Sequence, residues 1–592
     1  MTSSSSGPGP TGDLGPHVLR EYALLADGCR GALVGPRGDI CWMCAPSWES
    51  DAVFSALIGG VGSYRVMPAG RFVWGGHYEP GTLIWHSEWV TEDCVVTCRE
   101  ALAYPGDRHR VVILRRMGPA VAPQIFQIRL HAAAGFGDRT SEDLRRSADG
   151  VWTARTGALH LRISGAPELR AGIAGEPDGV LAAEIHVAVR EMRDLVVEVS
   201  DQSLPTELPD PETLWRDTER AWRSAVSPIG GTLADRDVTH ARAVLRGMTE
   251  PGGGMVAAAT MSLPERAEQG RNYDYRYVWI RDQAIAGQAA AAVGATDLVG
   301  DAVSFIAHRV ISDGPGLAPG YTLAGGSIPR EHSVSLAGYP GGFDIAGNRV
   351  ADQFQLDVFG EALLLFAAAA GVGLADGETG RAADIAAEAI AARWQAADAG
   401  IWELAPRRWT HSRLTCAAGL RAAAAARPPG DRAERWLGLA DRIVADTERL
   451  CAGPGGGWQR ADDDQRVDAA LLLPLIRDPA AAGTARATET IRAIERDLVD
   501  DFYVYRFRHD DGGGPADAEG AFLLCGFAMA MAQHRTGDRV AALRYFERNR
   551  AACGPPGLFS EEYDVVQRQM RGNIPQAFVH AMLMESAARL AV

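Results

Sequence analysis

The sequence predicts a chain built from an N-terminal antiparallel β-sandwich and a C-terminal barrel of paired helices, joined by a helical linker. Two observations predict this. Up to about residue 205 the apolar runs are short, rich in Val and Ile, and separated by Gly, Pro, Asp and Asn, which is typical of a sandwich. Beyond about residue 229 the apolar segments are longer, rich in Ala and Leu, and helical in period. The length of 592 residues suits this division, because domains usually hold about 100–200 residues.

The elements are expected in the following order. Residues 1–15 are rich in Ser, Gly and Pro and are expected to form a disordered tail. Residues 16–205 are the expected sandwich domain, with strand-like runs such as RVVILRRM and AAEIHVAV. Residues 206–228 are the expected linker, whose helix can start at Pro211 because proline fits the first helical turn. Residues 229–592 are the expected helical domain.

The helical domain shows about twelve segments of helical period. They lie near residues 236–249, 279–294, 296–311, 352–372, 376–396, 411–427, 431–450, 465–477, 481–500, 518–536, 538–551 and 575–591. Twelve helices suit six hairpins that close into an (α/α)6 barrel, whereas a solenoid would require an internal repeat, which the sequence does not show. One end of such a barrel carries long loops, and functional residues often lie on loops held by a rigid scaffold.

Charge and composition exclude several classes of function. The chain carries 59 basic and 75 acidic residues and a formal net charge of −16, whereas nucleic-acid binders usually have a basic excess that neutralises phosphates. None of the basic residues is lysine. P-loop, pyridoxal-phosphate and protein-kinase chemistry each require a lysine and are therefore excluded. A serine hydrolase is not expected, because no GxSxG motif is present.

The nine cysteines do not predict a disulfide framework, because their number is odd and they are scattered over a long chain. Cys41 with Cys44, and Cys94 with Cys98, have the close spacing found in zinc sites, so a metal site in this region stays open. Buried thiols that pack as small hydrophobic side chains are the favoured interpretation.

The chain is expected to be cytoplasmic. Its first residues, MTSSSSGPGPTGDLG, have neither the basic start nor the apolar run of a signal peptide. No stretch approaches the about 18 apolar residues that a membrane span requires. Neither a membrane nor a nucleic acid is therefore an expected partner, and assembly into a homo-oligomer is left open.

The loop at residues 264–283, PERAEQGRNYDYRYVWIRDQ, combines aromatic rings with fixed charges. Tyr275 and Trp279 stand close to Arg281 and Asp282. This combination suits a sugar, because rings stack on apolar C–H faces while Asp and Arg bind hydroxyl groups. Residue type alone equally suits the start of an interface helix with capping charges, so both interpretations stay open at this point.

Three glutamates stand in Gly-bounded loops with an aromatic residue nearby. Glu403 follows Trp402 in GIWELAPRRW, and Glu561 and Glu562 stand in GLFSEEYD before the last predicted helix. Glycoside hydrolysis requires two carboxyl groups, one kept protonated by an apolar neighbour and one ionised. Trp402 is such a neighbour, but with 75 acids in the chain the spacing alone does not select a pair.

Other acidic and histidine motifs are weaker. Asp462–Asp464 and Asp510–Asp511 resemble the metal-binding acids of terpene cyclases, which are also helical, but they match neither a DDxxD nor a DxDD pattern. Solvated loop acids are the favoured interpretation of both clusters. His411 is expected to shape the structure or the binding site and not to bind a metal.

Six ordered motifs decide between these interpretations. RNYDYRYVWIRDQA, ADQFQLDVFGEAL, GIWE…WTHSR, VDAALLLPLI, YRFRHDDGGGPADAEGAFLLC and SEEYD…GNIPQAF occur in this order over residues 271–578. They resemble the motifs of glycoside hydrolase family 15, the glucoamylases, glucodextranases and trehalases of actinobacterial type. The N-terminal GALVGPRGDICWMCAPSWESDAVFSALIGG resembles the opening of bacterial members. The resemblance implies an N-terminal β-supersandwich, a helical linker and a C-terminal (α/α)6 catalytic barrel.

The resemblance also implies roles for single residues. Glu403 takes the place of the general acid, and Glu561, the first acid of SEEYD, takes that of the general base. The residues that match the pocket for the terminal glucose are Tyr275, Trp279, Arg281, Asp282, Trp402 and Glu519. The chain departs from the family at Tyr273, where Trp is frequent, and at Val278, where Cys is frequent. Such departures bear on substrate preference and leave the chemistry intact.

The activity implied is that of an exo-acting, inverting α-glucoside hydrolase that releases β-glucose from the non-reducing end. The expected partner is a small oligosaccharide: a malto- or isomalto-oligosaccharide or trehalose. The scheme requires no metal and no organic cofactor. The alternative is a catalytically silent or repurposed family member that binds sugar or acts in a biosynthetic pathway, although the presence of Glu403 and Glu561 argues against it. A terpene-type cyclase is a third alternative, from another class.

Overall fold

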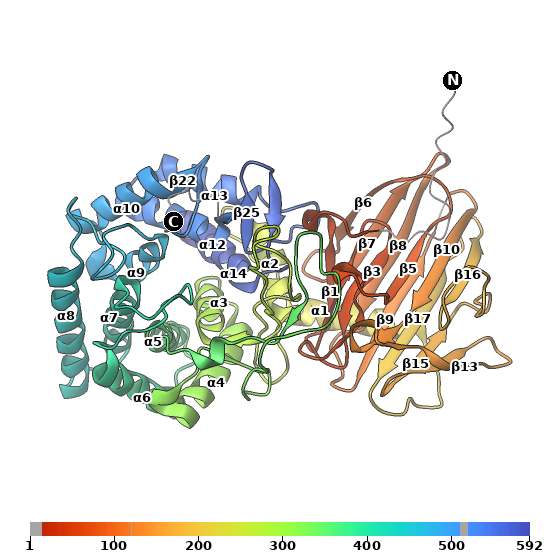
Figure 1. Ribbon diagram of the computed structural model, residues 1–592, viewed down its shortest axis with the longest axis horizontal. Coiled ribbons are helices and arrows are strands. Elements are labelled where there is room, and N and C mark those ends of the chain that lie inside the picture. The colour runs from red at the N-terminus through yellow and green to blue at the C-terminus, as the bar shows by residue number, and fades with distance from the viewer. Residues whose placement is uncertain (1–14, 120, 510–518) are drawn as a thin grey trace, which may run out of the picture. The chain divides into compact units, whose positions relative to one another are not determined.

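The computed structural model describes residues 15–119, 121–509 and 519–592. They form two compact units (Figure 1). The first unit contains the chain up to Glu79, Leu83–Trp222 and Val334–Asp344, and the second contains Pro80–Thr82, Arg223–Ser333 and Ile345–Val592. The tail expected at residues 1–15 lies, apart from Gly15, outside the described residues, and so do Asp510 and Asp511.

The first unit contains two antiparallel sheets, which confirms the predicted sandwich. One sheet has the order β1-β2-β3-β5-β10-β16, with β4 paired to β3, and the other has the order β13-β14-β15-β17-β9-β8-β7-β6. The strands of this unit are β1 (Ala23–Ala26), β2 (Gly31–Val34), β3 (Asp39–Cys44), β4 (Ala52–Phe54), β5 (Ser63–Pro68), β6 (Val73–Tyr78), β7 (Trp85–Val90), β8 (Val95–Leu102), β9 (Arg110–Met117), β10 (Gln124–His131), β11 (Ala133–Ala134), β12 (Arg139–Thr140), β13 (Glu142–Arg146), β14 (Trp152–Thr156), β15 (Leu159–Ser164), β16 (Leu181–Val187) and β17 (Arg193–Ser200).

The core of this unit follows from the alternation of side chains along each strand. In β5 the side chains of Tyr64 and Val66 are buried while their neighbours are partly exposed, and β14 alternates in the same way. Phe126 of the first sheet and Val197 of the second belong to one continuous cluster of buried apolar residues. The two sheets therefore share a single core, as in other sandwiches.

Helix α1 (Pro211–Ala225) begins at Pro211, where the sequence places a helix start. Its Trp222 is fully buried and stacks on Tyr104, with ring centroids 4.1 Å apart. The Nε1–H group of Trp215 donates a hydrogen bond to Asp194 at 3.0 Å. The apolar face of α1 up to Trp222 therefore packs into the sandwich unit.

Two short segments lie outside the domains predicted for them. Pro80–Thr82, expected within the sandwich domain, belong to the second unit. Val334–Asp344, expected within the helical domain, belong to the first unit. The N–H of Gly338 donates to the carbonyl oxygen of Ile58 at 3.0 Å, and the hydroxyl of Tyr339 donates to the carbonyl oxygen of His17 at 2.7 Å. Local sequence composition does not predict such long-range hydrogen bonds.

The second unit is a double ring of helices. In the described part of the chain, six inner helices contact one another in a closed circle, α3-α5-α7-α9-α12-α14 and back to α3. The inner helices are α3 (Ile280–Ala292), α5 (Asp357–Gly371), α7 (Thr410–Ala425), α9 (Leu472–Arg477), α12 (Leu523–Thr536) and α14 (Ala577–Leu590). The outer helices are α2 (Asp235–Gly247), α4 (Thr296–Asp313), α6 (Gly377–Arg393), α8 (Asp431–Cys451), α10 (Ala485–Leu498) and α13 (Arg539–Arg550). This closed arrangement agrees with the predicted (α/α)6 barrel (Figure 1).

Short strands lie in the loops of the second unit. They are β18 (Val278–Trp279), β19 (Gly320–Tyr321), β20 (His332–Ser333), β21 (Ile345–Ala346), β22 (Val499–Asp500), β23 (Tyr503–Val504), β24 (Ala521–Phe522), β25 (Glu562–Asp564) and β26 (Gln569–Arg571). β18 pairs with β19, and β24, β25 and β26 form one small sheet.

The two rings differ in how their helices are buried. Inner helix α12 is buried without a break from Leu523 to Gln533, whereas outer helix α8 buries one stripe that includes Trp436 and Ile443. The inner helices α5 and α7 approach closely. A Cβ atom on Gly419 would lie 2.4 Å from the carbonyl oxygen of Gly360, so this crossing requires glycine.

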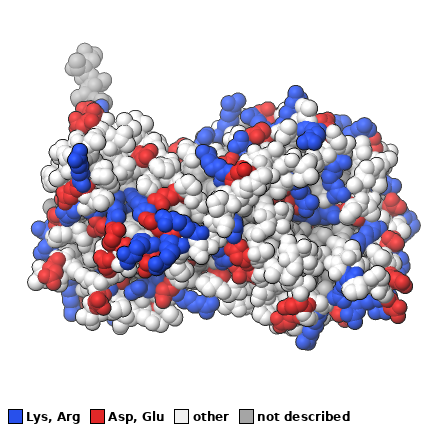
Figure 2. Space-filling model, turned by 180° about the vertical axis from the view of Figure 1, so that it is seen from behind, with Lys and Arg blue, Asp and Glu red and all other residues white. Residues whose placement is uncertain are grey.

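The surface carries charges of both signs. Figure 2 shows arginine and acidic side chains interspersed over the viewed face. Among the described residues, no helix combines the length and apolar character that crossing a membrane requires.

Candidate active site

A cavity of about 390 Å³ lies in the second unit, where the segments that lead into the inner helices meet. Each of the six inner helices contributes, from its first turn or from the segment before it. The lining residues are Ala257, Glu265, Arg271, Tyr273, Tyr275, Trp279, Arg281, Asp282, Glu331, Asn348, Arg349, Gln353, Ile401, Trp402, Glu403, Leu404, Ala405, Arg407, Trp409, Arg460, Asp464, Arg466, Arg506, Phe507, Arg508, His509, Phe522, Glu561, Gln576 and Phe578. Of the predicted site residues, only Glu519 does not line this cavity.

One wall of the cavity is aromatic. The backbone N–H groups of Ser262 and Ala258 donate to the carbonyl oxygens of Tyr273 and Tyr275, both at 2.9 Å, and Trp279 belongs to β18, which pairs with β19. Tyr273, Tyr275 and Trp279 all line the cavity. The rings of Tyr273 and Tyr275 are stacked at 6.1 Å, and Tyr275 meets Trp279 edge-to-face at 5.4 Å. This wall offers the apolar faces on which a sugar ring can stack.

Arg281 and Asp282 lie in the first turn of α3, directly after this wall. The Nη1 group of Arg281 donates to Oε1 of Gln355 at 3.0 Å, and its Nη2 atom lies 3.5 Å from Oδ2 of Asp282. The Nε atom of Arg281 and Oδ2 of Asp282 are buried and have no hydrogen-bond partner. Burial raises the pKa of Asp282 to about 6, although Arg281 lowers it. Buried polar groups without partners in a cavity wall point to a polar ligand.

Glu403 lies in a tight loop that precedes α7. The backbone N–H and carbonyl groups of Asp398 and Arg407 close this loop with two hydrogen bonds of 2.9 Å. The carboxylate of Asp398 accepts a hydrogen bond from the N–H of Gly400 at 2.9 Å and pairs with Arg413. Within the loop Glu403 has a φ of +56°, a left-handed conformation that costs a non-glycine residue about 1–2 kcal/mol. Such strained residues cluster at functional sites.

The carboxylate of Glu403 contacts Trp279 of the aromatic wall and lies near Arg281. The Nε1–H group of Trp279 donates to its Oε1 atom at 2.9 Å, and Nη2 of Arg281 lies 3.9 Å from the same oxygen. The side chain of Glu403 is 28% exposed. The acid is thus held by one indole donor and remains accessible from the cavity.

The structure separates the two acids of SEEYD. Glu561 lines the cavity, and the hydroxyl of Tyr275 donates to its Oε1 atom at 3.2 Å. Oε2 of Glu561 is buried and has no hydrogen-bond partner. Glu562 begins β25, and its Oε2 atom accepts a hydrogen bond from the N–H of Gly520 at 2.8 Å. Glu561 is therefore the acid of this motif that a ligand in the cavity can reach.

The surroundings of Glu561 favour its protonated form. Burial and the nearby carboxylate of Glu265 raise its pKa well above the usual range, and Asp282 adds to this effect. Arg506 and the hydrogen bond from Tyr275 lower the same pKa. Removing any one of these neighbours is therefore expected to change the pH at which Glu561 ionises.

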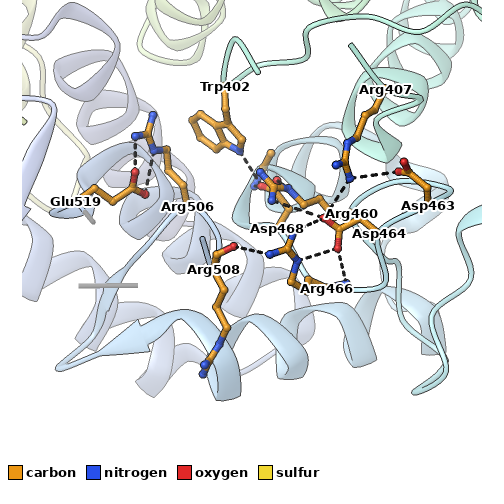
Figure 3. Close-up of polar contacts among 11 residues, drawn as sticks. Trp402, Arg407, Arg460, Asp463, Asp464, Arg466, Asp468, Arg506, Arg508 and Glu519 are labelled. Atoms are coloured by element: carbon orange, nitrogen blue, oxygen red, sulfur yellow. Dashed lines mark hydrogen bonds and ion pairs between the residues drawn. The ribbon is translucent and has the colours of Figure 1, made fainter. Parts of the chain in front are cut away.

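Trp402 and Glu519, predicted to line the pocket for the terminal glucose, are placed differently from each other (Figure 3). Trp402 lines the cavity, and its Nε1–H group donates to Asp468 at 2.8 Å. Glu519 is buried beside the cavity, where it accepts hydrogen bonds from Arg271 at 2.9 Å and from Nε of Arg506 at 3.1 Å. Although burial raises the pKa of Glu519, Arg506 and His509 lower it to about 2, so it is ionised. Glu519 thus holds two arginines that line the cavity.

The motifs did not single out Glu265 and Arg506 as cavity residues. Glu265 stands in LPER, six residues before the first motif, and Arg506 stands within YRFR. Neither residue type is distinctive in a chain with so many acids and arginines. Their places follow from tertiary packing, in which Nη2 of Arg506 lies 3.5 Å from Oε2 of Glu265.

The acid cluster at Asp462–Asp464 is only partly solvated. Asp462 and Asp463 are exposed, but Asp464 is buried, lines the cavity and accepts from Nε of Arg466 at 2.9 Å (Figure 3). The expectation of solvated acids is therefore wrong for Asp464, because Arg466 compensates its burial.

His411 contacts Thr415 at 3.2 Å, and burial and Arg281 lower its pKa to about 3, so it is neutral. The described cysteines are free thiols. Within residues 15–119, 121–509 and 519–592 no group of three or more His, Cys, Asp or Glu side chains is arranged to hold a metal ion.

The arrangement supports acid–base chemistry on a small neutral polyol. Two carboxyl groups, Glu403 and Glu561, enter one cavity, each with an aromatic hydrogen-bond donor from the segment before α3. One is partly exposed and the other is buried, so the two carboxyl groups lie in different environments. The aromatic wall and the Arg281–Asp282 pair provide the apolar and polar contacts that a sugar needs.

The chain is similar to known proteins over nearly its full length. A family model described as glycosyl hydrolases family 15 matches residues 240–588, and one described as trehalase-like, N-terminal, matches residues 12–133. A protein named trehalase from Mycobacterium tuberculosis is 27% identical over 97% of this chain and 89% of its own length. A trehalase from Mycolicibacterium smegmatis is 27% identical over 97% of this chain and 91% of its own length.

A solved structure titled bacterial glucoamylase complexed with acarbose has the same fold. It superposes with a TM-score of 0.74, at 14% identity, over 99% of this chain and 96% of its own. At this identity the likeness concerns the fold alone. Every residue that lines the cavity falls within the range matched by the first family model.

Proposed function

We propose that this chain, which belongs to the glycosyl hydrolases of family 15, hydrolyses a small α-glucoside, with trehalose as its preferred substrate. The choice of trehalose rests on the relatives named trehalase that align with 97% of the chain, and on the trehalase-like model at its N-terminus. Malto- and isomalto-oligosaccharides are the other candidate substrates.

In the proposed reaction Glu403 is the general acid and Glu561 the general base. Glu403 protonates the glycosidic oxygen while Glu561 removes a proton from a water on the opposite face of the glucose ring. The glycosidic C–O bond breaks as the new bond to the water oxygen forms, so the configuration at the anomeric carbon inverts. Asp282 and Arg281 bind the hydroxyls of the glucose that is attacked, and Tyr275 and Trp279 stack against it.

A single observation carries this proposal. Glu403 and Glu561 come from segments 158 residues apart, yet both face the same cavity, each bonded to an aromatic donor of the segment before α3. Arg281 and Asp282 support it, because both line the cavity and each has a buried polar atom without a hydrogen-bond partner.

The test is a panel of glucose disaccharides, assayed for glucose release with the native enzyme and with Glu403→Gln and Glu561→Gln. We expect trehalose to give the highest kcat/KM and both variants to lose several orders of magnitude while remaining folded. Binding of trehalose without turnover would instead support a silent, sugar-binding family member. Higher activity on maltose or isomaltose would contradict the substrate but not the chemistry.

A further inference from the structure

Arg506 lies in a cluster of buried carboxylates beside the cavity. Its guanidinium contacts Glu519 and also Glu265 and Glu562, with its Nη2 atom 3.5 Å from an oxygen of each of the last two. Arg271 brings a second positive charge through its contact with Glu519 at 2.9 Å. Two guanidinium groups thus face three buried carboxylates even before Glu561 is counted.

Glu265 is the member of this cluster that shares the cavity with Glu561. Both side chains are 4% exposed. They flank Gly572: a Cβ atom there would lie 3.5 Å from Oε2 of Glu561 and 3.8 Å from Cγ of Glu265. The N–H of Gly572 donates to the carbonyl oxygen of Pro264 at 2.9 Å, which fixes the two segments to each other. The oxygen of Glu561 that has no hydrogen bond and the side chain of Glu265 therefore both border Gly572.

Charges on all sides of this pair affect its ionisation. The groups that face Glu265 are Arg506, Arg271, Glu519, Glu403, Glu561, Glu562, Tyr273 and Tyr275. Those that face Glu561 are Glu265, Arg506, Asp282, Glu562 and Tyr275. Burial raises the pKa of Glu265 to about 7, although Arg506 lowers it, so Glu265 ionises close to neutral pH.

We propose that Glu265 is a positioning residue that tunes the catalytic base: its carboxylate, held by Arg506 beside Glu561, makes Glu561 bind a proton more tightly. This inference rests on the proposed function and assigns a role to a residue that takes no part in the proposed proton transfers. A base that binds a proton more tightly withdraws it from water more readily. The same charge also sets the pH below which Glu561 becomes protonated and the enzyme stops.

Coulomb's law determines whether the charge of Glu265 raises or lowers the pKa of Glu561. A negative charge beside Glu561 disfavours its ionised form and therefore raises its pKa. Removing that charge lowers the pKa, so the acid limb of the pH profile of kcat/KM moves to lower pH. For two carboxyl groups coupled this closely the movement is expected to be about one pH unit or more. Because the base is then weaker, the plateau value of kcat falls.

The experiment compares pH profiles of kcat/KM for the native enzyme, Glu265→Gln, Glu265→Asp and Glu331→Gln. Glu265→Gln keeps the size of the side chain and a hydrogen-bond acceptor for Arg506 but removes the charge. Glu265→Asp keeps the charge. Glu331→Gln removes a carboxylate that lines the same cavity but is exposed, and it serves as the matched control.

We expect the acid limb to move to lower pH in Glu265→Gln alone. Glu265→Asp and Glu331→Gln should keep the acid limb of the native enzyme. An acid limb that stays in place or moves upward in Glu265→Gln would overturn the proposal. So would an equal movement in Glu265→Asp, because loss of packing, and not of charge, would then be the cause.

A second measurement does not depend on turnover. Subtracting the infrared pH titration of Glu561→Gln from that of the native enzyme isolates the carboxyl band of Glu561, and the same subtraction is made in the Glu265→Gln background. A lower midpoint in that background supports the tuning role, even if the native enzyme hydrolyses none of the disaccharides. Equal midpoints in both backgrounds overturn it, whatever the substrate proves to be.

Discussion

Asp282→Asn is expected to make the fold more stable at neutral pH while it disables the enzyme. The carboxyl group of Asp282 is buried, and its pKa is raised from 3.8 to about 6. Since one pKa unit corresponds to about 1.4 kcal/mol, holding the ionised form in the native state costs about 3 kcal/mol at pH 7. Asparagine has nearly the same shape and no charge, so it avoids this cost.

The gain in stability must depend on pH. The native state binds the Asp282 proton more tightly than the unfolded state, so the cost is absent below about pH 4 and grows as the pH rises to about 6. We expect the free energy of unfolding of the helical unit to rise by about 2 kcal/mol at pH 7, because the asparagine amide interacts less well with Arg281 than a carboxylate does. Near pH 3.5 the variant and the native enzyme should be equally stable.

Although Asp282→Asn should raise the stability, it should lower the activity. A hydrogen bond to a charged group that is lost from a buried site reduces transition-state binding by about 2–4 kcal/mol, or about 30-fold to 1,000-fold in kcat/KM. The assays are urea unfolding at both pH values and initial rates of trehalose hydrolysis. Lower stability of Asp282→Asn at pH 7 would show that its pair with Arg281 is mainly structural. Unchanged kinetics would remove Asp282 from the binding of glucose.

Two further predictions concern the groups that transfer protons. Glu403→Gln should lose several orders of magnitude in kcat on trehalose but far less on α-glucosyl fluoride, because fluoride leaves with little need of an acid; equal losses on both substrates would remove Glu403 from the acid role. Tyr275→Phe removes the hydrogen bond that lowers the pKa of Glu561, so the acid limb of kcat/KM should move to higher pH, opposite to the movement expected for Glu265→Gln. A movement of the Tyr275→Phe limb to lower pH would show that the hydroxyl does not stabilise the ionised base.

Local sequence patterns were sufficient to predict the sandwich and the helices of the second unit. Val- and Ile-rich runs with period 2 identify the sandwich, and Ala/Leu-rich segments identify the helices, because burial of an apolar face imposes those periods on the sequence. Local patterns did not predict that residues 334–344 belong to the first unit. They join the first unit through hydrogen bonds such as that between Gly338 and Ile58, partners far apart in sequence.

The sequence motifs contain most of the predicted residues that line the cavity, but they do not indicate which side chains of a loop face the cavity. Glu561 and Glu562 are adjacent and of the same type, yet only the first lines the cavity. Glu519 belongs to a motif but lies behind Arg271 and Arg506. Such placement depends on where the arginines lie, which no local pattern records.

Glu265 could not be predicted as a site residue for a different reason. It lies outside the six motifs, and its importance arises only when Gly572 brings it beside Glu561. Burial and the charges of Glu519 and Glu403 raise the pKa of Glu265, and burial and the charge of Glu265 raise that of Glu561. These causes are properties of the packed structure and not of composition.

In the proposed reaction Glu403 and Glu561 act from opposite faces of one glucose ring. It is tested most directly by proton NMR during the first minutes of hydrolysis, before the anomers interconvert. Inversion at one anomeric carbon of trehalose produces one β-glucose, while the leaving glucose keeps its α-configuration. We expect equal initial amounts of α- and β-glucose from trehalose, and β-glucose alone from α-glucosyl fluoride. Initial release of α-glucose alone from either substrate would contradict inversion and the role of Glu561 as base.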